Sequence, residues 1–367
     1  MPRADVYLQD ALAAFDFGAP VERAERFGQG HINDTFVVRT QSEDCRRFIL
    51  QRISPVAFKR PDQLMENAAG ITGYLARELE KTGGDVRRGT LHFLRTKDGG
   101  CYYTDGDGGA WRAYPFVEGT VCYETAETPE LFAASGRAFG RFQRLLQGYP
   151  AQTLYETIPH FHDTEDRLAK LKAAVEADPL GRAAGCAREI AFVLAREKDC
   201  SVALQAQRDG KLPLRVTHND TKLNNVLMDE ETGEGVCIVD LDTVMPGLSI
   251  NDFGDSIRFG ANHCAEDERD LNKVNLDLGL FEIYTRAFLE GADGTLTEEE
   301  VNYLPWGAKL MTLECGMRFL TDHLEGDAYF HIEREGQNLD RCRTQFKLVS
   351  DMEAHWPALE GIVARCR

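Results

Sequence analysis

The chain has no long apolar run, no closely paired cysteines, and fewer basic than acidic residues. No stretch approaches the roughly 20 apolar residues of a membrane-spanning helix, and residues 1–20 lack a signal peptide's basic start and apolar middle. Its 42 Lys and Arg are outnumbered by 60 Asp and Glu, a formal net charge of −18, which argues against a nucleic-acid partner. We therefore expect a cytoplasmic protein that binds neither nucleic acid nor membrane.

Cysteines are present but lack the spacing of a disulfide or zinc framework. None of the ten forms a CxxC pair, and most lie among apolar residues, at positions 45, 101, 122, 186, 200, 237, 264, 315, 342 and 366. Reduced core cysteines are the favoured interpretation. The acidic balance suits a cationic substrate, but a surface charge that keeps the protein soluble is the favoured explanation.

The elements expected along the chain divide it into a β-rich first third and a helical remainder. Strands are expected within 24–52 on both sides of a glycine loop and at 111–117, and the turns of two further hairpins at 97–100 and 105–109. Helices are expected over 5–15 and 62–80, from 128 onwards, and near 164–177, 187–208, 266–290, 297–325 and 338–365. A chain of 367 residues is long for one core. The pattern predicts an α+β, bilobal, protein-kinase-like fold.

The two lobes are expected to divide at the connection that follows the last N-terminal strand. The N-lobe, which binds the nucleotide, covers 1–118, and the C-lobe, which carries catalysis and acceptor binding, covers 119–367. The crossover near 116–120, which includes Glu118, takes the position of a hinge whose backbone groups bind adenine. The sequence predicts no particular oligomeric state.

The most informative segment is HNDTKLNN at 218–225, which has the pattern H-x-D-x4-N. Phosphoryl transfer from ATP requires one carboxylate to accept the acceptor's hydroxyl proton and an amide nearby to hold a metal ion. Asp220 is predicted to be the catalytic base, and Asn225 to be a magnesium ligand. His218 is expected to pack and orient the loop, while Lys222 is either a cation for the moving phosphoryl group or a solvated side chain.

A second acidic motif, VDLDT at 239–243, supplies the remaining metal ligands. The turn at 230–235 separates two short apolar runs and predicts a hairpin that returns Asp240 to Asn225. Asp240 is predicted to hold the same magnesium ion. Asp242, two residues on, lies on the same strand face and either contacts a second magnesium or is a hydrogen-bonded turn carboxylate.

Two further motifs bear on the nucleotide and the catalytic loop. Gly28 and Gly30 frame a loop between strands, where glycines let backbone amides approach phosphates; a simple turn is the alternative. His31 and Asn33 extend this loop, either toward phosphate or sugar or as local turn residues. The Asp252-Phe253-Gly254-Asp255 run follows Asp240, so it is expected to brace the catalytic loop and not to hold metal.

The third strand has no lysine to grip the nucleotide. The run that corresponds to the third strand of protein kinases is FILQR at 48–52, and neutral Gln51 occupies the position at which those enzymes have a lysine. Strand neighbours point to opposite faces, so Gln51 and Arg52 are not expected to face ATP together. We expect the phosphate grip to rest on magnesium and loop amides, with Glu66 an uncertain ion-pair partner.

These motifs resemble the aminoglycoside-phosphotransferase and choline-kinase branch of the protein-kinase-like enzymes. Within that branch, the strings at 28–33, 216–225, 239–247, 252–261 and 314–320 are similar to those of the N-acetylhexosamine 1-kinases. The resemblance implies an ATP- and Mg²⁺-dependent kinase of a sugar's anomeric hydroxyl. It also implies acceptor contacts from His31, Phe259, Arg318, Asp322 and Tyr329. Helix packing with a structural ion pair is the alternative for the last three, and another small hydroxyl compound is the alternative acceptor.

Overall fold

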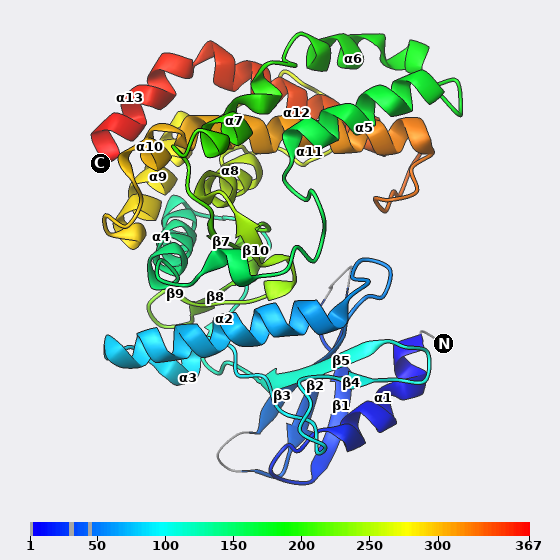
Figure 1. Ribbon diagram of the computed structural model, residues 1–367, viewed down its shortest axis with the longest axis vertical. Helices are drawn as coiled ribbons and strands as arrows, with labels where there is room; N and C mark the ends of the chain where they lie inside the picture. The colour runs from blue at the N-terminus through cyan, green and yellow to red at the C-terminus, as the bar shows by residue number, and fades with distance from the viewer. Residues whose placement is uncertain (1–2, 29–32, 43–45) are drawn as a thin grey trace.

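The computed structural model describes residues 3–28, 33–42 and 46–367. A small β-sheet lies at one end of the molecule and a larger helical part at the other, with the N-terminus in the former and the C-terminus in the latter (Figure 1). The fold is therefore α+β and bilobal, as the sequence predicts. The expected boundary at 118 falls between the last long strand of the sheet and the first strand of the helical part.

The sheet is antiparallel, with strand order β1-β2-β3-β5-β4. Its strands are β1 (Val21–Arg26), β2 (Asp34–Thr40), β3 (Arg47–Arg52), β4 (Tyr103–Thr104) and β5 (Ala110–Pro115). Alternation of side chains along β3 covers both faces. Phe48 and Leu50 pack toward α1 (Arg3–Ala14), whereas Ile49 packs toward α2 (Pro61–Lys81). A short α3 (Val86–Gly89) follows α2.

One expected hairpin is absent from the described part of the sheet. The turn at 105–109 joins β4 to β5 as predicted, but the arm before the 97–100 turn forms only an isolated bridge, between Thr96 and Phe15. The backbone amide of Leu94 instead bonds the carbonyl of Ala113 on β5. That segment therefore runs along the sheet without becoming a strand.

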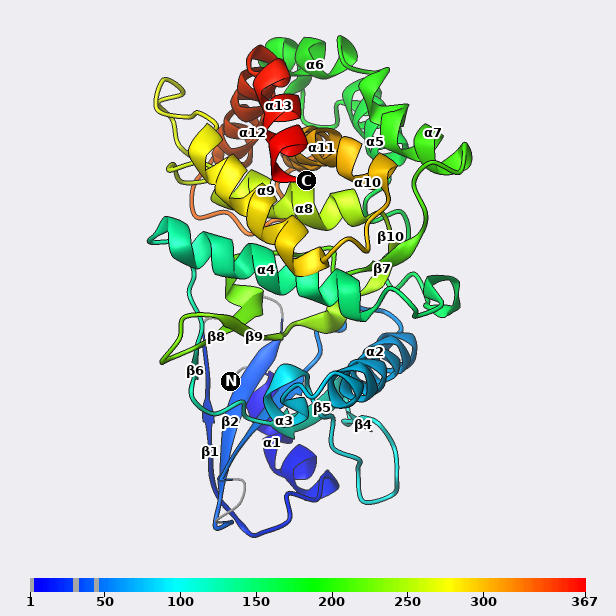
Figure 2. The same cartoon turned by 90° about the vertical axis from the view of Figure 1, so that its left-hand side faces the viewer.

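The C-terminal part consists of helices with two small sheets. The helices are α4 (Pro129–Leu145), α5 (Thr164–Ala177), α6 (Ala187–Leu194), α7 (Val202–Arg208), α8 (Ser249–Gly260), α9 (Leu278–Ala292), α10 (Glu298–Asn302), α11 (Leu304–Glu325), α12 (Gln337–Ala354) and α13 (Trp356–Cys366). The strands are β6 (Thr120–Val121), β7 (Arg215–Thr217), β8 (Val226–Asp229), β9 (Gly235–Ile238) and β10 (Met245–Gly247). Figure 2 shows α4 between the β8–β9 hairpin and α9, both of which it contacts.

Helix ends explain where the sequence predictions were right and where they were wrong. Thr128 caps α4, and Thr297 with Glu300 forms the expected capping box of α10. Helices expected over 297–325 and 338–365 are each broken, just before Pro305 and Pro357, because proline cannot donate a backbone hydrogen bond. The helix expected over 187–208 is interrupted after Leu194, and the one expected from 266 begins only after its cap, Asp277.

Two features of the packing position the functional site. A buried cluster joins the two parts, since Ile49, Ile71 of α2, Phe142 of α4 and Leu241 all belong to it. Glycines then bring α8 and α11 into backbone contact: a Cβ on Gly254 would lie 2.2 Å from the carbonyl oxygen of Gly307.

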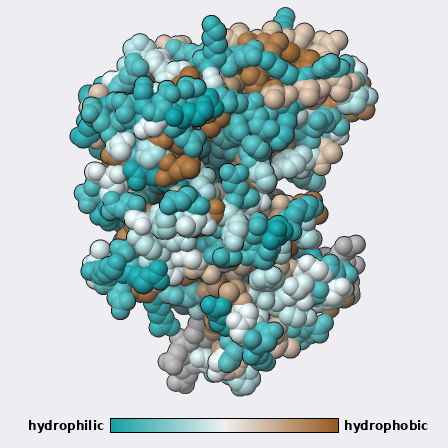
Figure 3. Space-filling model, viewed as in Figure 1, coloured by the Kyte–Doolittle hydropathy of each residue, from teal (hydrophilic) through white to brown (hydrophobic). Residues whose placement is uncertain are grey.

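The face seen in Figure 3 is mostly hydrophilic, and no helix of the described residues is both long and apolar enough to cross a bilayer.

Candidate active site

The predicted catalytic loop, residues 218–225, follows β7, and side chains of α8 hold it in place. Asn219 has a left-handed backbone (φ 66°), a conformation that asparagine tolerates better than most residues. The fully buried Asp252 carboxylate accepts hydrogen bonds from the backbone amides of His218 and Asn219, at 3.0 and 2.8 Å. Gln143 of α4 donates to the same carboxylate at 2.7 Å. These contacts set the direction in which the loop leaves the strand.

A second acid of α8 supports the other side of the loop. Asp255 accepts from the backbone amide of Thr221 at 3.0 Å and is paired with Arg258. Asp252 and Asp255 therefore brace the loop, as the sequence predicts. His218 is buried too, with its Nε2 2.9 Å from the carbonyl oxygen of Val239 and its ring against Phe139, which fits the expected packing role.

The predicted base and its neighbours lie together in this loop. The Asp220 carboxylate is 3.1 Å from Nζ of Lys222 and accepts a hydrogen bond from Asn225 Nδ2, also at 3.1 Å. Asn225 Nδ2 donates as well to the Asp220 backbone carbonyl at 2.8 Å. The amide nitrogen of Asn225 is thus turned to Asp220, which leaves its oxygen free to accept or to bind a cation.

The expected hairpin returns Asp240 to this place. Val226 pairs with Ile238, and the amide of Val239 bonds the Asn225 carbonyl at 2.9 Å. Asp240 then adopts a left-handed backbone (φ 57°) at the end of the hairpin. Burial, followed by the charges of Asp242 and Asp220, raises the pKa of Asp240 to about 7.

These residues fit a magnesium ion. No donor to the Asp240 carboxylate is found within the described residues, and its pKa is raised first by burial and then by the charges of Asp242 and Asp220. A cation would relieve that repulsion. Carboxylate and amide oxygens are magnesium's usual protein ligands, so Asp240 and Asn225 would hold the ion. No trio of His, Cys, Asp or Glu side chains suited to a metal occurs in the described part of the chain, so phosphate and water oxygens would complete the coordination.

Asp242, the third predicted metal ligand, is instead bonded to the N-terminal sheet. Its carboxylate is paired with Arg112 of β5 and accepts a hydrogen bond from Asn33 Nδ2 at 2.6 Å. Asn33 in turn accepts from the backbone amide of Ser54 at 3.0 Å. Asp242 therefore connects the two parts of the molecule in this structure.

Gln51 and Arg52 point to opposite faces of the sheet, as expected. Gln51 lies on the same face as Arg112, and its Oε1 accepts from Arg112 Nε at 3.0 Å. Arg52 is buried on the other face and forms an ion pair with Asp105 at 2.7 Å. Gly28 has a positive φ of 75°, a conformation that suits glycine, whereas Gly30 and His31 lie outside the described residues.

Glu118 lies in the connection between the two parts. Its carboxylate is paired with Arg47 of β3, whose guanidinium also covers the Phe116 ring at 4.0 Å. The neighbouring Gly119 carbonyl accepts from Arg88 at 3.0 Å. The hinge predicted at 116–120 is thus fixed by side chains from both β3 and the α3 region, and adenine binding there stays a prediction.

The residues predicted for the acceptor fall into two groups beside the catalytic loop. The Arg318 guanidinium lies 5.3–5.9 Å from the ring centroids of Phe161, Tyr329 and Phe330. No ion pair of Arg318 is found among the residues described. Tyr329 is 69% exposed and can therefore meet a ligand.

Asp322 acts within the protein. Its carboxylate accepts from the backbone amides of Ala328, Tyr329 and Phe330 and from the Asn338 side chain, all at 2.8–3.0 Å. Asp322 therefore folds the loop that presents Tyr329. A direct contact with an acceptor stays a prediction for this residue.

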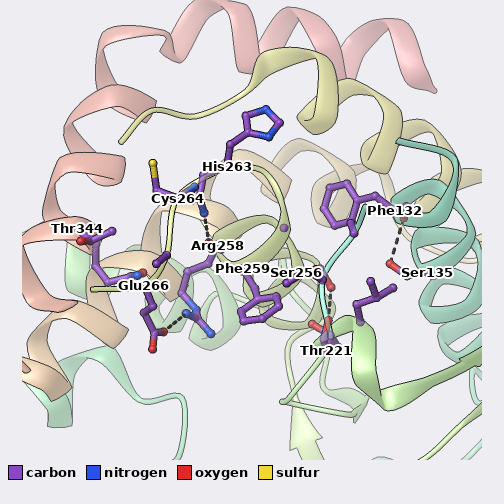
Figure 4. A pocket seen from close by; sticks show the side chains of 17 residues that line it. Phe132, Ser135, Thr221, Ser256, Arg258, Phe259, His263, Cys264, Glu266 and Thr344 are labelled. Carbon is purple, nitrogen blue, oxygen red and sulfur yellow. Dashed lines mark hydrogen bonds and ion pairs between the residues drawn. The ribbon is translucent and has the colours of Figure 1, made fainter. Parts of the chain in front are cut away.

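Phe259 lines a cavity of about 440 Å³ on the Thr221 side of the catalytic loop. Figure 4 shows Phe259 beside Arg258, whose guanidinium bonds Glu266, and opposite Thr221 and Ser256. Arg318, Asp322 and Tyr329 are not among the lining residues. Phe259 therefore lies in a different place from the group formed by Arg318, Asp322 and Tyr329.

Two residues of the site were missed from the sequence. Arg112 is one; it lies directly opposite Gln51 in the β3–β5 pairing, and no signal in the sequence places it there. His162 is the other: its Nδ1 lies 2.9 Å from Glu314 and its Nε2 3.1 Å from the Asn219 carbonyl. No local motif marks His162, which reaches the loop only through tertiary structure.

The sequence comparison identifies the class of protein that this site defines. The pattern of the phosphotransferase enzyme family matches residues 23–286, which include most of β1 and the whole β8–β9 hairpin. The match covers most of the chain, so the chain belongs to this family. Fold and family together make it a kinase-like small-molecule phosphotransferase.

Solved structures with the same fold are distant in sequence. An aminoglycoside phosphotransferase from Alicyclobacillus acidocaldarius has 14% identity and a TM-score of 0.58, over 97% of this chain and 96% of that one. A microcompartment-associated aminopropanol kinase has 15% identity and a TM-score of 0.57, over 97% and 98%. Choline kinase from Cryptosporidium parvum has 12% identity and a TM-score of 0.54, over 93% and 91%. At these identities the likeness establishes the protein-kinase-like fold alone.

Proposed function

We propose that this enzyme transfers the γ-phosphoryl group of ATP, with magnesium, to the anomeric hydroxyl of an N-acetylhexosamine. N-Acetylglucosamine and N-acetylgalactosamine are the acceptors, and the product is the sugar 1-phosphate. The observation that carries the proposal is the meeting of Asp220, Asn225 and Asp240 at one end of the β8–β9 hairpin. A base and two metal-binding oxygens in one place are what phosphoryl transfer needs.

Asp220 orients the acceptor hydroxyl and takes its proton. A positioned base of this kind contributes roughly 10²–10⁴ in rate. Lys222, 3.1 Å from the Asp220 carboxylate, neutralises charge beside it. Bound magnesium would supply charge neutralisation at the phosphates, held by Asn225 and Asp240. Because the transition state is loose, most of the remaining acceleration comes from alignment and fixed charge.

The acceptor side supports a sugar. The Arg318 guanidinium is enclosed by aromatic rings and carries no ion pair within the described structure, so its planar donors are available to hydroxyl or acetamido oxygens. The exposed Tyr329 ring and Phe259 offer flat apolar surfaces to the faces of a sugar ring. An anomeric hydroxyl is also more acidic than other sugar hydroxyls, so an aspartate is an adequate base.

The alternative is a kinase of the same fold that phosphorylates another small hydroxyl compound. The family relatives named above act on, or are named for, aminoglycosides, aminopropanol and choline, and homoserine or a plain hexose is compatible with the same catalytic loop. A cationic acceptor would suit the net charge of −18, which a surface charge that keeps the protein soluble also explains without any ligand.

The experiment is a panel of acceptors with Mg-ATP, with ³¹P NMR of the products. The panel contains N-acetylglucosamine, N-acetylgalactosamine, glucosamine, glucose, kanamycin, choline, aminopropanol and homoserine. A phosphorus signal coupled to the anomeric proton, from the two acetylated sugars in preference to the others, is the expected result. Preferred turnover of an amino alcohol or aminoglycoside would establish the alternative and reject the sugar assignment.

A further inference from the structure

Arg112 is the buried cation of the sheet that faces the acids of the active site. Its side chain is only 2% exposed, and β5 pairs with β3 so that Arg112 lies directly opposite Gln51. Its guanidinium is bonded to Asp242 and to Gln51 Oε1, and it lies 5.8 Å from the Phe93 ring. A buried guanidinium needs such partners, because removing a charge from water is costly.

The acids around it explain why a cation is required at this place. Asp240 and Asp242 follow the β8–β9 hairpin, and Arg112 is paired with Asp242. A nucleotide would add several phosphate charges to the same region. Of the described arginines and lysines on the sheet, Arg112 is the one bonded to an acid of the 240–242 segment.

The usual candidates for this task are absent or turned away. Gln51 occupies the position of the third-strand lysine that grips phosphates in protein kinases, and Arg52 points to the opposite face, to Asp105. The acid that such a lysine pairs with would come from α2, but Glu66 there is exposed to solvent. Asn67, the buried neighbour of Glu66, instead donates to the Val244 carbonyl at 3.1 Å.

We propose that Arg112, extended from β5 and held by Gln51 and Asp242, is the phosphate-binding cation of the nucleotide site. The ion pair of Arg112 with Asp242 takes the place of the lysine–glutamate pair of protein kinases. The cation then comes from β5, the strand next to β3, and the acid comes from the end of the β8–β9 hairpin and not from α2. A guanidinium presents a planar fork of donors that matches two phosphate oxygens, so it suits the α- and β-phosphates better than a point charge.

This inference rests on the use of ATP in the proposed function, and nucleotide binding tests it without any acceptor. Calorimetric titration with adenosine, ADP and a non-hydrolysable ATP analogue, with and without Mg²⁺, would be run on the wild type and on Arg112→Lys and Arg112→Met. Arg112→Met should bind ADP and the ATP analogue about tenfold more weakly or worse, with adenosine binding unchanged. Arg112→Lys should recover part of that loss.

Two further variants keep the outcome clear. Arg112→Met leaves a buried carboxylate unpaired, so the double variant Arg112→Met with Asp242→Asn removes both charges and should fold while showing the same phosphate-dependent loss. Arg52 is also buried, but it follows Gln51 in β3 and lies on the opposite face of the sheet from Arg112. The Arg52→Met variant should therefore leave the ratio of ADP to adenosine affinity as in the wild type.

The inference would be overturned if folded Arg112 variants kept the wild-type ratio, if Arg52→Met lowered it equally, or if the wild type bound ADP no more tightly than adenosine. Failure of the acceptor assignment is seen separately, in the product panel. An enzyme that phosphorylates choline or an aminoglycoside would leave this nucleotide comparison unaffected.

Discussion

The side-chain amide of Asn225 donates to both the carboxylate and the backbone carbonyl of Asp220, at 3.1 and 2.8 Å. One side chain therefore fixes the base and offers its remaining oxygen to the metal side. A carboxylate held in this way cannot rotate freely, so Asn225, which we propose as a magnesium ligand, also sets the direction from which Asp220 can accept a hydroxyl proton.

Replacing Asn225 by aspartate should separate these two functions. The Asn225→Asp variant keeps an oxygen for the metal, loses both donations and places a second carboxylate against Asp220. We expect kcat to fall by about 100-fold, the scale of a mispositioned base. Steady-state kinetics would be compared with Asn224→Asp, an adjacent change of the same charge at a side chain that bonds Glu124. Equal effects of the two variants would contradict the positioning role.

Removing the base should stop turnover and leave nucleotide binding intact. In Asp220→Asn the amide cannot accept the hydroxyl proton, so kcat should fall by roughly 10²–10⁴, while the affinity for Mg-ATP, measured by calorimetry, stays within about twofold because Asp240 and Asn225 are unchanged. Turnover close to that of the wild type would remove Asp220 from the mechanism.

Stability should depend on pH through His162. Burial lowers the pKa of this histidine, but the charge and hydrogen bond of the adjoining Glu314 carboxylate, the charge of Asp255 and the Asn219 carbonyl together outweigh that effect, and the pKa is raised above its ordinary value. A raised folded pKa gives stability that is complete below the unfolded value, about 6.5, and is lost as pH rises through the folded value. The free energy of unfolding should therefore decline above pH 6.5.

Urea unfolding at a series of pH values would measure that decline. In His162→Gln the part due to the histidine should vanish, so the difference in stability from the wild type should shrink as pH rises. His331→Gln, a change at an exposed histidine, serves as the control and should follow the wild-type slope. A constant difference between His162→Gln and the wild type at all pH values would be contrary to this assignment.

Asp322 should affect the acceptor through the loop that it folds. Asp322→Asn replaces an acceptor oxygen with a donor facing backbone amides, a loss of about 1–3 kcal/mol locally. Hydrogen exchange of residues 328–330 should accelerate and the KM for the acceptor should rise, with the KM for ATP unchanged. Asp293→Asn, at an exposed residue paired with Arg144, is the control. A raised acceptor KM without faster exchange would indicate direct contact with the acceptor instead.

The β8–β9 hairpin was predictable because residues close together in the sequence determine it. The apolar runs on both sides of the 230–235 turn determine the pairing, and the pairing fixes where Asp240 returns. The capping residues Thr128 and Thr297 likewise define helix starts by themselves. Such features need only neighbours in sequence.

The cation that we propose for the nucleotide site was not predicted because its position depends on strand order. Arg112 meets Gln51 only because β5 is placed next to β3, and β3 and β5 are far apart in the chain. His162 reaches the Asn219 carbonyl across a connection of similar length, with no motif around it. The role of Asp322 was also hidden, since the sequence does not tell which carboxylates have their oxygens occupied by backbone amides.

The buried cluster that joins Ile49, Ile71, Phe142 and Leu241 bears on how the chain can be divided. A cut at residue 118 follows the change in architecture, yet it would leave half of one apolar core on each fragment. Neither fragment should then be soluble alone, and limited proteolysis should release no stable half-molecule. The protein should melt in one cooperative step, with a nucleotide bound at the junction raising the melting temperature of the whole.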